Sequence, residues 1–513
     1  MNIGIDFGTS YSWPATVAYG SPRILLPLGM DGIPSVFYYD TQTLNGQPLV
    51  GVKAEGRAMY QPDNCVREIK MKIKEHAEDR FILEDRVFNK QQIIASILQE
   101  VIRIACEKTK EDPDSYNRPQ SIDRAVISIP AAFGLQERDI IRRAAQLPKK
   151  DGGPELTDLS FIKEPVAAAI SYFAEPNPED DNPILVYDLG GGTCDVAVVR
   201  PNRENEEWYD VLATDMVRIG GRDWDKALVE MIADRYQKET SKTLDTGNVM
   251  VENELRREAI KVKHGLSEND SRAATPCIDG SYNWSCTIKL EEFEDATAEL
   301  LQRTMDVVDK IKSKYESENN DVVNRILCVG GSSKMPQVEK AFKRKYGEAD
   351  ILLYRPADAI ALGSAVFAEH FSDDGGDHRF LQDISSFSYG VRSVDDYRQY
   401  HDRNRMRVFN LIYKNKPLPT EGSHSFSPLD DHQETIRYPI FESKCCDEKY
   451  RPEDGEEIGD LVFHNVDYLT SEDITEVEMT IDLSGLMHVS AREKKRGREV
   501  SVRIDLKNIH NER

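Results

Sequence analysis

The sequence predicts an α/β region over residues 1–371 and an all-β sandwich over residues 387–513. Short apolar strands alternate with helices through the first region, a rhythm typical of helices packed on sheets. Two strands of that region end in the same sequence pattern, which is an Asp followed by a Gly-rich turn and a Thr. Beyond residue 387 the helices give way to short alternating runs separated by turns, which favours a sandwich of antiparallel sheets.

Length and charge bound the class of protein before any motif is considered. The chain has 513 residues, of which 39% are hydrophobic and 30% charged, enough for a large core and for two or more domains. Its formal net charge of −24 argues against generic binding to nucleic acid or acidic membranes. The chain start lacks the pattern of a signal peptide, and no apolar run reaches spanning length. We therefore expect a cytoplasmic protein without nucleic-acid or membrane partners.

Eight cysteines are scattered along the chain, with no C-x-x-C pair and no matching His cluster. This spacing favours reduced thiols over a disulfide framework or a zinc site. The adjacent residues Cys445 and Cys446 are interpreted as two unrelated thiols rather than a redox device.

The first strand of the α/β region is followed by a turn suited to phosphate. The segment "NIGIDFGTSYS" places Asp6 at the end of a short apolar strand, ahead of Gly8, Thr9 and Ser10. Glycine lets another group approach the main chain closely, and the N–H groups of such a turn can face an anion. The Thr9 hydroxyl can donate to a phosphate oxygen.

Two further strand and helix pairs follow in the same region. The segment "RAVISIP" (124–130) is a β-branched strand that ends at Pro130, and a helix is expected after it up to residue 147. The segment "SFIKEPVAAAISYF" predicts a short strand and then an Ala-rich helix with Pro165 in its first turn. Both pairs support an α/β core.

The segment "ILVYDLGGGTCDVAVV" (184–199) repeats the design of the first turn with Asp188, Gly190–Gly192 and Thr193. Alone it is either a surface turn or a phosphate cradle. Two such turns suggest two related halves folded around one site, each presenting its turn to the phosphates. Because two carboxylates facing each other across phosphates repel, Mg²⁺ is implied between them, held through water molecules.

A third glycine turn follows the strand that begins at Arg325. In "RILCVGGSSKMPQVEK" the strand is followed by Gly330, Gly331 and a helix that Ser332 and Ser333 are expected to cap. Such a helix start is suited to a nucleotide, although a strand-to-helix glycine turn is also a common structural joint.

Four segments together resemble the actin-like ATPase domain of the DnaK-type heat-shock 70 kDa chaperone family. They are "DFGT" (6–9), "IKEPVAAA" (162–169), "DLGGGTCD" (188–195) and "VGGSSKMP" (329–336). The β region resembles the peptide-binding β-domain of the same family in "NKPLPTEGSHSFSPLDDHQ" and "MTIDLSGLMHVSAREKKRG". The resemblance implies an α/β actin-like ATPase of two lobes over 1–371, an interdomain linker over 372–386, and a substrate-binding sandwich over 387–513 without the family's helical lid.

The resemblance also implies which residues act on ATP. Lys70, in "VREIKMKIKE", would stabilise the γ-phosphate charge and orient the attacking water. The implied catalytic residues are Lys70, Glu164, Asp188 and Thr193, and the implied metal residues are Asp6, Asp188 and Asp195. Asp195 would hold cations, K⁺ included, beside the Mg²⁺. From the residues alone, Lys70 is a solvated helix lysine, Glu164 a helix-start carboxylate and Cys194 a small apolar core residue.

The implied nucleotide contacts come from several segments. They are Gly8, Thr9, Ser10, Gly190, Gly191, Gly192, Gly221, Lys263, His264, Ser267, Gly330, Gly331, Ser332 and Lys334. The pair that relays the nucleotide state in the family falls on Pro130 and Arg138. Three positions depart from the family pattern, because Ile260, Arg222 and Ala357 stand where the family has acids. These departures concern residues expected to contact the ribose and the adenine. The residues expected to act on the phosphates are all present.

In the β region the resemblance implies a cleft that holds an extended peptide by main-chain hydrogen bonds. Its implied pocket residues are Phe426, Leu429 and Ile436, for which ordinary sandwich core is an equal alternative. The loop expected over the cleft, residues 393–407, is longer and more charged than in the family. In the linker, Leu381 and Ile384 are the apolar residues expected to dock on the ATPase region. A peptide cleft without a lid should exchange its peptide quickly.

These features lead to one main functional hypothesis and two alternatives. The main hypothesis is an ATPase that hydrolyses ATP to ADP and phosphate and binds unfolded or extended polypeptides in a nucleotide-controlled way. Its cofactors would be ATP or ADP, Mg²⁺ and K⁺, and its helpers a J-domain co-chaperone and a nucleotide exchange factor. The first alternative is an ATP-sensing adaptor with one dedicated partner. The second alternative, a small-molecule kinase, is disfavoured because it would give the β region no function.

Overall fold

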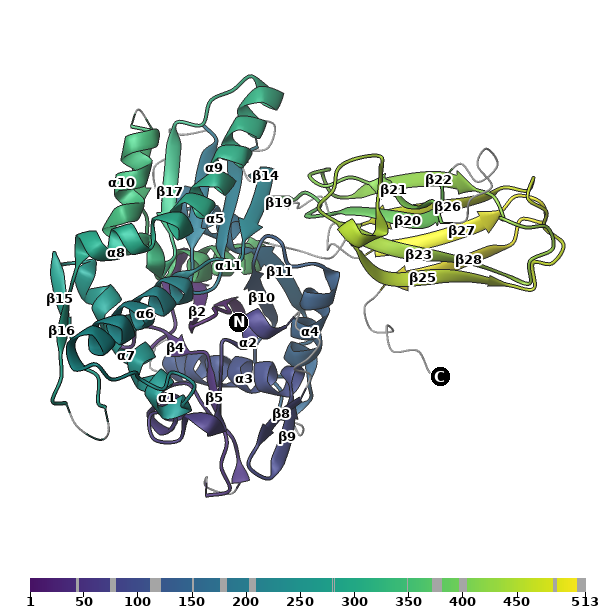
Figure 1. Ribbon diagram of the computed structural model, residues 1–513. Coiled ribbons are helices and arrows are strands. Elements are labelled where there is room, and N and C mark those ends of the chain that lie inside the picture. Colours follow the sequence, from purple (N-terminus) through teal and green to yellow (C-terminus); the bar gives the residue numbers. More distant parts are fainter. Residues whose placement is uncertain are drawn as a thin grey trace. The chain divides into compact units, whose positions relative to one another are not determined.

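The computed structural model describes residues 1–42, 46–73, 80–110, 121–149, 152–175, 182–202, 209–278, 280, 282–347, 349–370, 381–395, 404–482 and 487–504. Parts of three predicted features lie outside these residues. They are 372–380 of the linker, 396–403 of the charged loop, and 483–485 of the hairpin turn that the segment "DLSG" (482–485) predicts between two strands of the sandwich. The chain divides into two compact units (Figure 1). The first comprises Met1–Ala131, Ile140–Tyr209 and Ala213–Phe380, and the second comprises Ala132–Asp139, Asp210–Leu212 and Leu381–Arg513.

Two sheets of the first unit share one strand order. The first contains β1 (Asn2–Asp6), β2 (Tyr11–Ala18), β3 (Ser21–Ile24), β10 (Arg124–Ile129) and β11 (Leu159–Lys163) in the order β11-β10-β1-β2-β3, and β4 (Ile33–Pro34) pairs with β2. The second contains β12 (Ile184–Leu189), β13 (Cys194–Pro201), β14 (Tyr209–Val217), β17 (Arg325–Val329) and β18 (Asp350–Leu353) in the order β18-β17-β12-β13-β14. In each sheet the central strand pairs antiparallel with the next strand of the chain and parallel with a later one. Asp6 and Asp188 therefore occupy equivalent strands.

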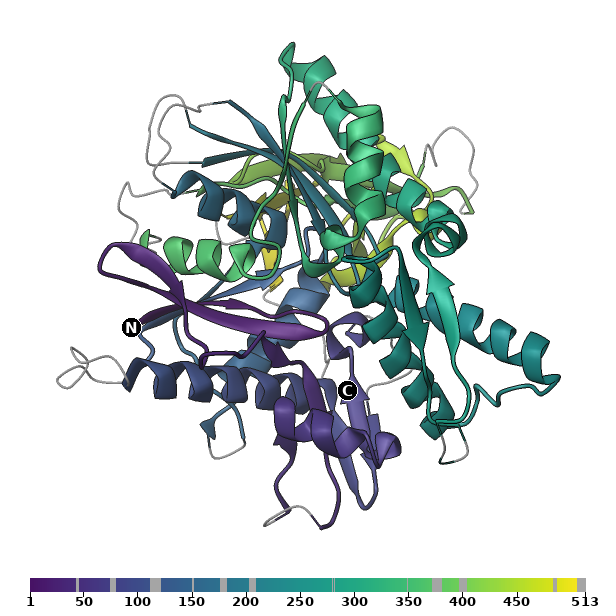
Figure 2. The ribbon, with the colours of Figure 1, turned by 90° about the vertical axis from the view of Figure 1, so that its left-hand side faces the viewer.

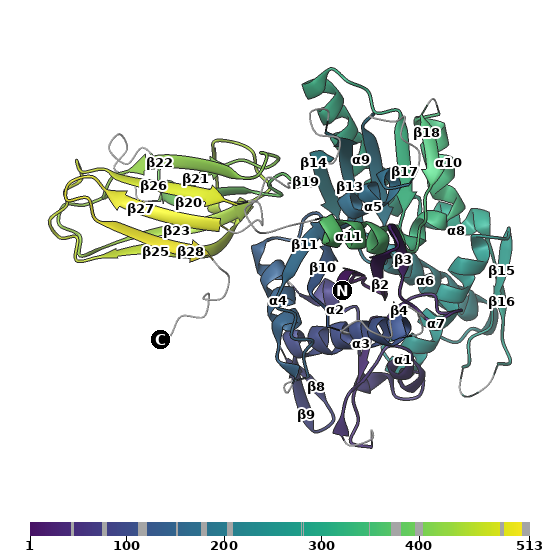
Figure 3. The ribbon, with the colours of Figure 1, turned by 180° about the vertical axis from the view of Figure 1, so that it is seen from behind.

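Two helices lie between these sheets. The helix α11 (Ala359–His370) packs on β1, β2 and β10, and α5 (Glu164–Phe173) packs on β12 and β13, while the two helices also contact each other (Figure 3). Their contact is close, because a methyl group at Gly363 of α11 would lie 1.7 Å from Ala167 O of α5. Nearly every residue of α5 and α11 is buried, as expected for helices covered on both sides.

The remaining elements surround this centre. The helices are α1 (Val52–Ala58), α2 (Ile69–Lys72), α3 (Lys90–Lys110), α4 (Leu135–Gln146), α6 (Gly221–Thr240), α7 (Val249–Leu266), α8 (Leu290–Ala296), α9 (Ala298–Asn319) and α10 (Pro336–Lys345). The small strands are β5 (Val36–Tyr38), β6 (Leu49–Val50), β7 (Cys65–Arg67), β8 (Arg80–Leu83), β9 (Arg86–Asn89), β15 (Ser271–Ala274) and β16 (Cys286–Lys289). Figure 2 shows α3 running along the N-terminal strands. No helix within the described ranges has the length and apolar character that a bilayer span requires.

The second unit contains two antiparallel sheets. One has the order β24-β21-β20-β23-β25, from β20 (Ser388–Val394), β21 (Met406–Ile412), β23 (Thr435–Ser443), β24 (Lys449–Tyr450) and β25 (Glu456–His464). The other has the order β22-β26-β27-β28, from β22 (Thr420–Phe426), β26 (Thr475–Ile481), β27 (Met487–Glu493) and β28 (Glu499–Ile504). The short β19 (Leu381–Gln382) precedes them.

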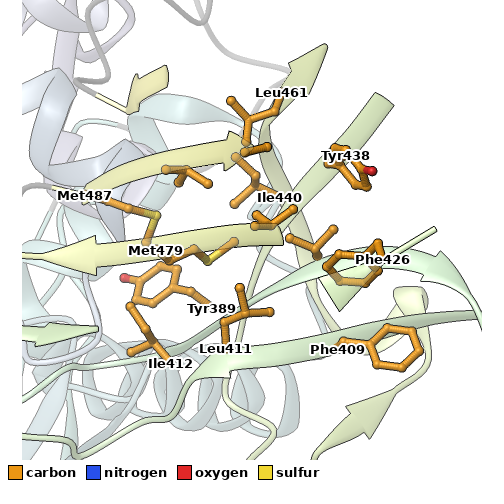
Figure 4. Packing of buried hydrophobic residues seen from close by; sticks show 14 of the residues in the cluster. Tyr389, Phe409, Leu411, Ile412, Phe426, Tyr438, Ile440, Leu461, Met479 and Met487 are labelled. Atoms are coloured by element: carbon orange, nitrogen blue, oxygen red, sulfur yellow. The ribbon is translucent and has the colours of Figure 1, made fainter. Parts of the chain in front are cut away.

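One apolar core joins the two sheets of the second unit. Tyr389, Leu411 and Ile440 come from one sheet, and Met479 and Met487 come from the other (Figure 4). Buried and exposed residues alternate along β26 and β27, as they do in strands with one face on a core. The second unit is therefore a β-sandwich, as the sequence predicts.

Candidate functional site

The two predicted phosphate turns face each other in the first unit. One follows β1 and carries Thr9 and Ser10, and the other joins β12 to β13 and carries Gly191 and Gly192. A methyl group at Gly191 would lie 2.7 Å from Ser10 Oγ, and one at Gly192 would lie 3.1 Å from Thr9 Oγ1. Side chains larger than glycine would therefore fill the space between the turns.

The start of α6 packs directly on the second turn. The Gly221 amide donates to Gly190 O at 2.9 Å, and the Arg222 amide donates to Gly191 O at 2.9 Å. A methyl group at Gly220 would lie 2.6 Å from both Gly191 C and Gly192 Cα. Sequence reasoning missed Gly220, although the Gly-Gly pair was a signal for it.

The third glycine turn, which follows β17, also contacts the second phosphate turn. Its serines do not cap the helix as the sequence predicts. Ser332 Oγ donates to Gly190 O at 3.0 Å, and Ser333 Oγ donates back to Val329 O at 2.5 Å. The two serines lie in a single 3₁₀ turn, Gly331–Lys334, and α10 begins only at Pro336, after Met335. The prediction that Ser332 and Ser333 cap the helix is wrong, because their hydroxyls bond to backbone carbonyls of the turn after β12 and of β17 instead.

Lys70 is buried, so the interpretation of a solvated helix lysine is wrong. Its side chain lies in an ion pair with Glu164, at the start of α5, and Lys70 Nζ also donates to Phe7 O at 2.6 Å. Lys70 and Glu164 are only 4% and 5% exposed. Burial alone would lower the pKa of Lys70, but the charges of Glu164 and Asp6 outweigh it and raise this pKa above its usual value.

Three buried aspartates accompany this ion pair. The Ser128 hydroxyl donates to Asp6 Oδ1 at 3.0 Å, and the Ala131 amide donates to Asp195 Oδ1 at 2.5 Å. Asp188 Oδ1 and Asp195 Oδ2 are buried without a hydrogen-bond partner among the described residues. A buried carboxylate oxygen without a partner is costly, and a ligand or cation would remove that cost.

Burial and mutual repulsion shift the titration of these acids. Burial, followed by the charge of Glu164, raises the pKa of Asp6 to about 7 and that of Asp195 to about 7. The same two causes raise the pKa of Asp188 well above its usual range. Four carboxyl groups thus face one lysine ammonium. A bound divalent cation would compensate the excess negative charge.

The residues present fit a hydrated Mg²⁺ better than a directly bound one. Within the described ranges, no three His, Cys, Asp or Glu side chains are close enough to hold a metal between them. Mg²⁺ keeps several waters and is bound through one or two carboxylates plus substrate phosphates. The unpartnered oxygens of Asp188 and Asp195 suit that mode, with Asp6 on the equivalent strand of the other sheet.

The predicted adenine-side residues are only partly brought together. Lys263 Nζ donates to Gly221 O at 3.0 Å and pairs with Asp225 at 2.7 Å, so it lies beside the glycine turn. His264 is exposed, and burial of part of its ring together with Lys263 lowers its pKa. The Ser267 hydroxyl donates to Lys263 O, as at an ordinary helix end. Lys334 is exposed on the 3₁₀ turn.

The other predicted site residues are placed as follows. Pro130 is buried directly after β10, and Arg138 lies on α4, where its Nε donates to Phe133 O at 3.2 Å. Phe426 and Ile436 are part of the sandwich core, where Phe426 contacts the rings of Phe409 and Tyr438 (Figure 4). These contacts favour the core alternative for Phe426.

Three further residues named in the sequence analysis are buried or half-buried. Leu429 is half-buried in the sandwich unit, while Ile384 is buried there and forms a β-bridge with Pro417. Cys194 is fully buried, and burial raises the pKa of its thiol well above the usual value, in keeping with the small apolar core residue expected there.

The fold and site together define a class of protein, an α/β protein with two equivalent glycine turns beside a buried cluster of charged residues, and with a β-sandwich as its second unit. A family model described as "Hsp70 protein" matches residues 2–513. The chain therefore belongs to the Hsp70 protein family, which confirms the family suggested by the four motifs. Members of this family are ATPases and ATP-dependent chaperones that bind ATP or ADP with Mg²⁺, unfolded polypeptides and co-chaperones.

Proposed function

We propose that this chain hydrolyses ATP to ADP and phosphate and that the bound nucleotide controls how tightly the β-sandwich holds extended polypeptide segments. The observation that carries the proposal is the convergence of two phosphate turns on a buried Lys70–Glu164 pair and on two unpartnered aspartate oxygens. Phosphoryl transfer needs little covalent chemistry from the protein and depends on positioning and charge stabilisation. The chain supplies donors, a fixed ammonium and carboxylates for that purpose.

The proposed roles follow from where each side chain is held. Thr9 and Thr193 would donate to phosphate oxygens from the two turns. Lys70, fixed by Glu164 and Phe7 O, would face the γ-phosphate, and Glu164 would orient the attacking water. Asp188 and Asp195 would hold the waters of Mg²⁺, which supplies charge neutralisation of the phosphate oxygens when bound. K⁺ beside Asp195, the relay through Pro130 and Arg138, the helper proteins and a cytoplasmic location remain predictions.

The experiment compares steady-state ATP hydrolysis by the wild type, Lys70→Ala and Lys72→Ala, each with and without a panel of extended apolar peptides. Lys72 is the matched control, since it lies on the same short helix as Lys70 but its side chain lies over the ring of Phe81. We expect turnover to be lost in Lys70→Ala only and to be stimulated by many different peptides. Turnover in Lys70→Ala equal to that of the wild type would refute the proposed site.

The second candidate, an ATP-sensing adaptor, is favoured by the charged loop that begins at Asp395. The base of that loop is held by charge, since Lys449 pairs with Asp395 at 2.8 Å and Arg405 lies 3.7 Å from it. In the same experiment, turnover that responds to none of the peptides would support the adaptor and contradict general peptide binding.

A further inference from the structure

Met71 contacts the second phosphate turn from the segment that carries Lys70. It lies in α2 directly after Lys70 and is only 4% exposed. A methyl group at Gly192 would lie 2.5 Å from Met71 Sδ and 2.9 Å from Met71 Cγ. The thioether therefore occupies the space that a side chain at position 192 would need, and it packs on the main chain of the turn.

Gly192 also contacts the start of α6. A methyl group at Gly220 would lie 2.4 Å from Gly192 N and 2.6 Å from Gly192 Cα. This part of the turn is thus held by contacts with both α6 and the Met71 side chain. Thr193, whose hydroxyl is proposed to donate to a phosphate oxygen, is the next residue, so a shift of Gly192 moves that donor as well.

Two consecutive side chains of α2 reach different parts of the candidate site, because neighbouring residues of a helix do not face each other. Lys70 contacts Glu164 and the carbonyl of Phe7, which directly follows β1. Met71 contacts the turn after β12. A thioether suits this second contact, since Met is unbranched and polarizable and fills irregular gaps.

We infer that Met71 is a positioning residue for the proposed hydrolysis, and that its thioether sets the distance between the Lys70 ammonium and the second phosphate turn. The inference rests on the proposed ATP site and adds an apolar spacer to it. Removal of this spacer leaves a gap beside Gly192, and the turn that carries Thr193 is then free to move into it. The rate of the chemical step depends steeply on such positions, while the nucleotide keeps its other proposed contacts.

The test is single-turnover hydrolysis of bound ATP by the full chain, with the dissociation constant of ADP measured on the same samples. Misplacement by about 1 Å costs on the order of 10²-fold in rate, so for a shift of about half that size we expect hydrolysis about tenfold slower in Met71→Ala. The ADP dissociation constant should change by less than about threefold, since the contact acts on the chemical step.

Two further variants separate apolar volume from length. Met71→Leu keeps the apolar volume and should hydrolyse ATP within about twofold of the wild type. Met71→Gln keeps the length of the side chain but buries an amide beside the turn, and it should be as slow as Met71→Ala. Should Met71→Ala fail to fold, Met71→Val, which shortens the side chain and removes less volume, carries the test.

The matched control is Met305→Ala. Met305 is 3% exposed, as deeply buried as Met71, but it lies in α9, outside the elements that form the phosphate turns. Its truncation should lower the Tm as truncation of Met71 does, because both remove the same buried atoms. It should leave the single-turnover rate at the wild-type value.

Three results overturn the inference while leaving the nucleotide site in place. The first is wild-type hydrolysis in both Met71→Ala and Met71→Gln. The second is an equal loss of rate in Met305→Ala, which would assign the effect to a general loosening of the core. The third is a Met71→Leu variant as slow as Met71→Ala. If the wild type itself neither binds nor hydrolyses ATP, the proposed function fails and the spacer fails with it.

Discussion

Replacement of Gly220 by Ala should strongly impair catalysis while leaving the nearby side chains in place. The new methyl carbon would lie 2.4 Å from Gly192 N and 2.6 Å from Gly191 C and Gly192 Cα, whereas ordinary contact begins at 3.4 Å, so the phosphate turn must move by about 1.0 Å. All three obstructing atoms belong to the main chain and cannot rotate away. Misplacement of a reacting group by about 1 Å costs on the order of 10²-fold in rate, and overpacking of this kind costs about 1–3 kcal/mol of stability.

The assay is single-turnover ATP hydrolysis, with thermal unfolding measured in parallel. The matched control is Gly56→Ala, because Gly56 lies exposed in α1 and a methyl group there would meet no atom within 4 Å. We expect unchanged hydrolysis in that variant and a stability gain of about 0.5–1 kcal/mol. A Gly220→Ala enzyme with wild-type hydrolysis would refute the argument that the start of α6 sets the position of the phosphate turn.

Three further predictions concern the metal, the sandwich core and pH. In the presence of ADP, Mg²⁺ should raise the Tm of the wild type more than that of Asp195→Asn, because the variant lacks one of the charged oxygens proposed to hold the hydrated ion; a Tm rise equal in both would contradict this role. Phe426→Ala should lower the free energy of unfolding of the sandwich by about 3–5 kcal/mol in urea melts, whereas Leu429→Ala should cost less, since only Phe426 is buried in the core. The bond from Lys495, followed by that from the Thr470 amide, lowers the pKa of Asp473 to about 2, so its stabilisation is present above pH 4 and lost towards pH 2. Melting curves of Asp473→Asn should therefore differ from the wild type at pH 7 and approach it as the pH falls through 2.

The sequence by itself determined the family, and it located the α/β segments, the β segments and the two glycine turns that are proposed to hold phosphate. These features are local. An Asp at the end of an apolar strand, followed by glycines and a Thr, specifies its own turn whatever lies around it, and the recurrence of that design indicated the equivalent sheets that place Asp6 and Asp188 on matching strands. The family match over residues 2–513 has the same origin, since it is carried by the order of such motifs.

The tertiary structure alone decided which distant groups meet. Lys70 looked like a solvated helix lysine, and it is buried because Glu164, at the start of α5, and Phe7 O, directly after β1, converge on it. Ser332 and Ser333 looked like helix caps, and their hydroxyls bond to carbonyls of β17 and of the turn after β12 instead. Glu68 bonds to Arg222 and Arg256, which lie more than 150 positions away in the sequence. Such contacts depend on how strands and helices pack, and local spacing carries no signal for them.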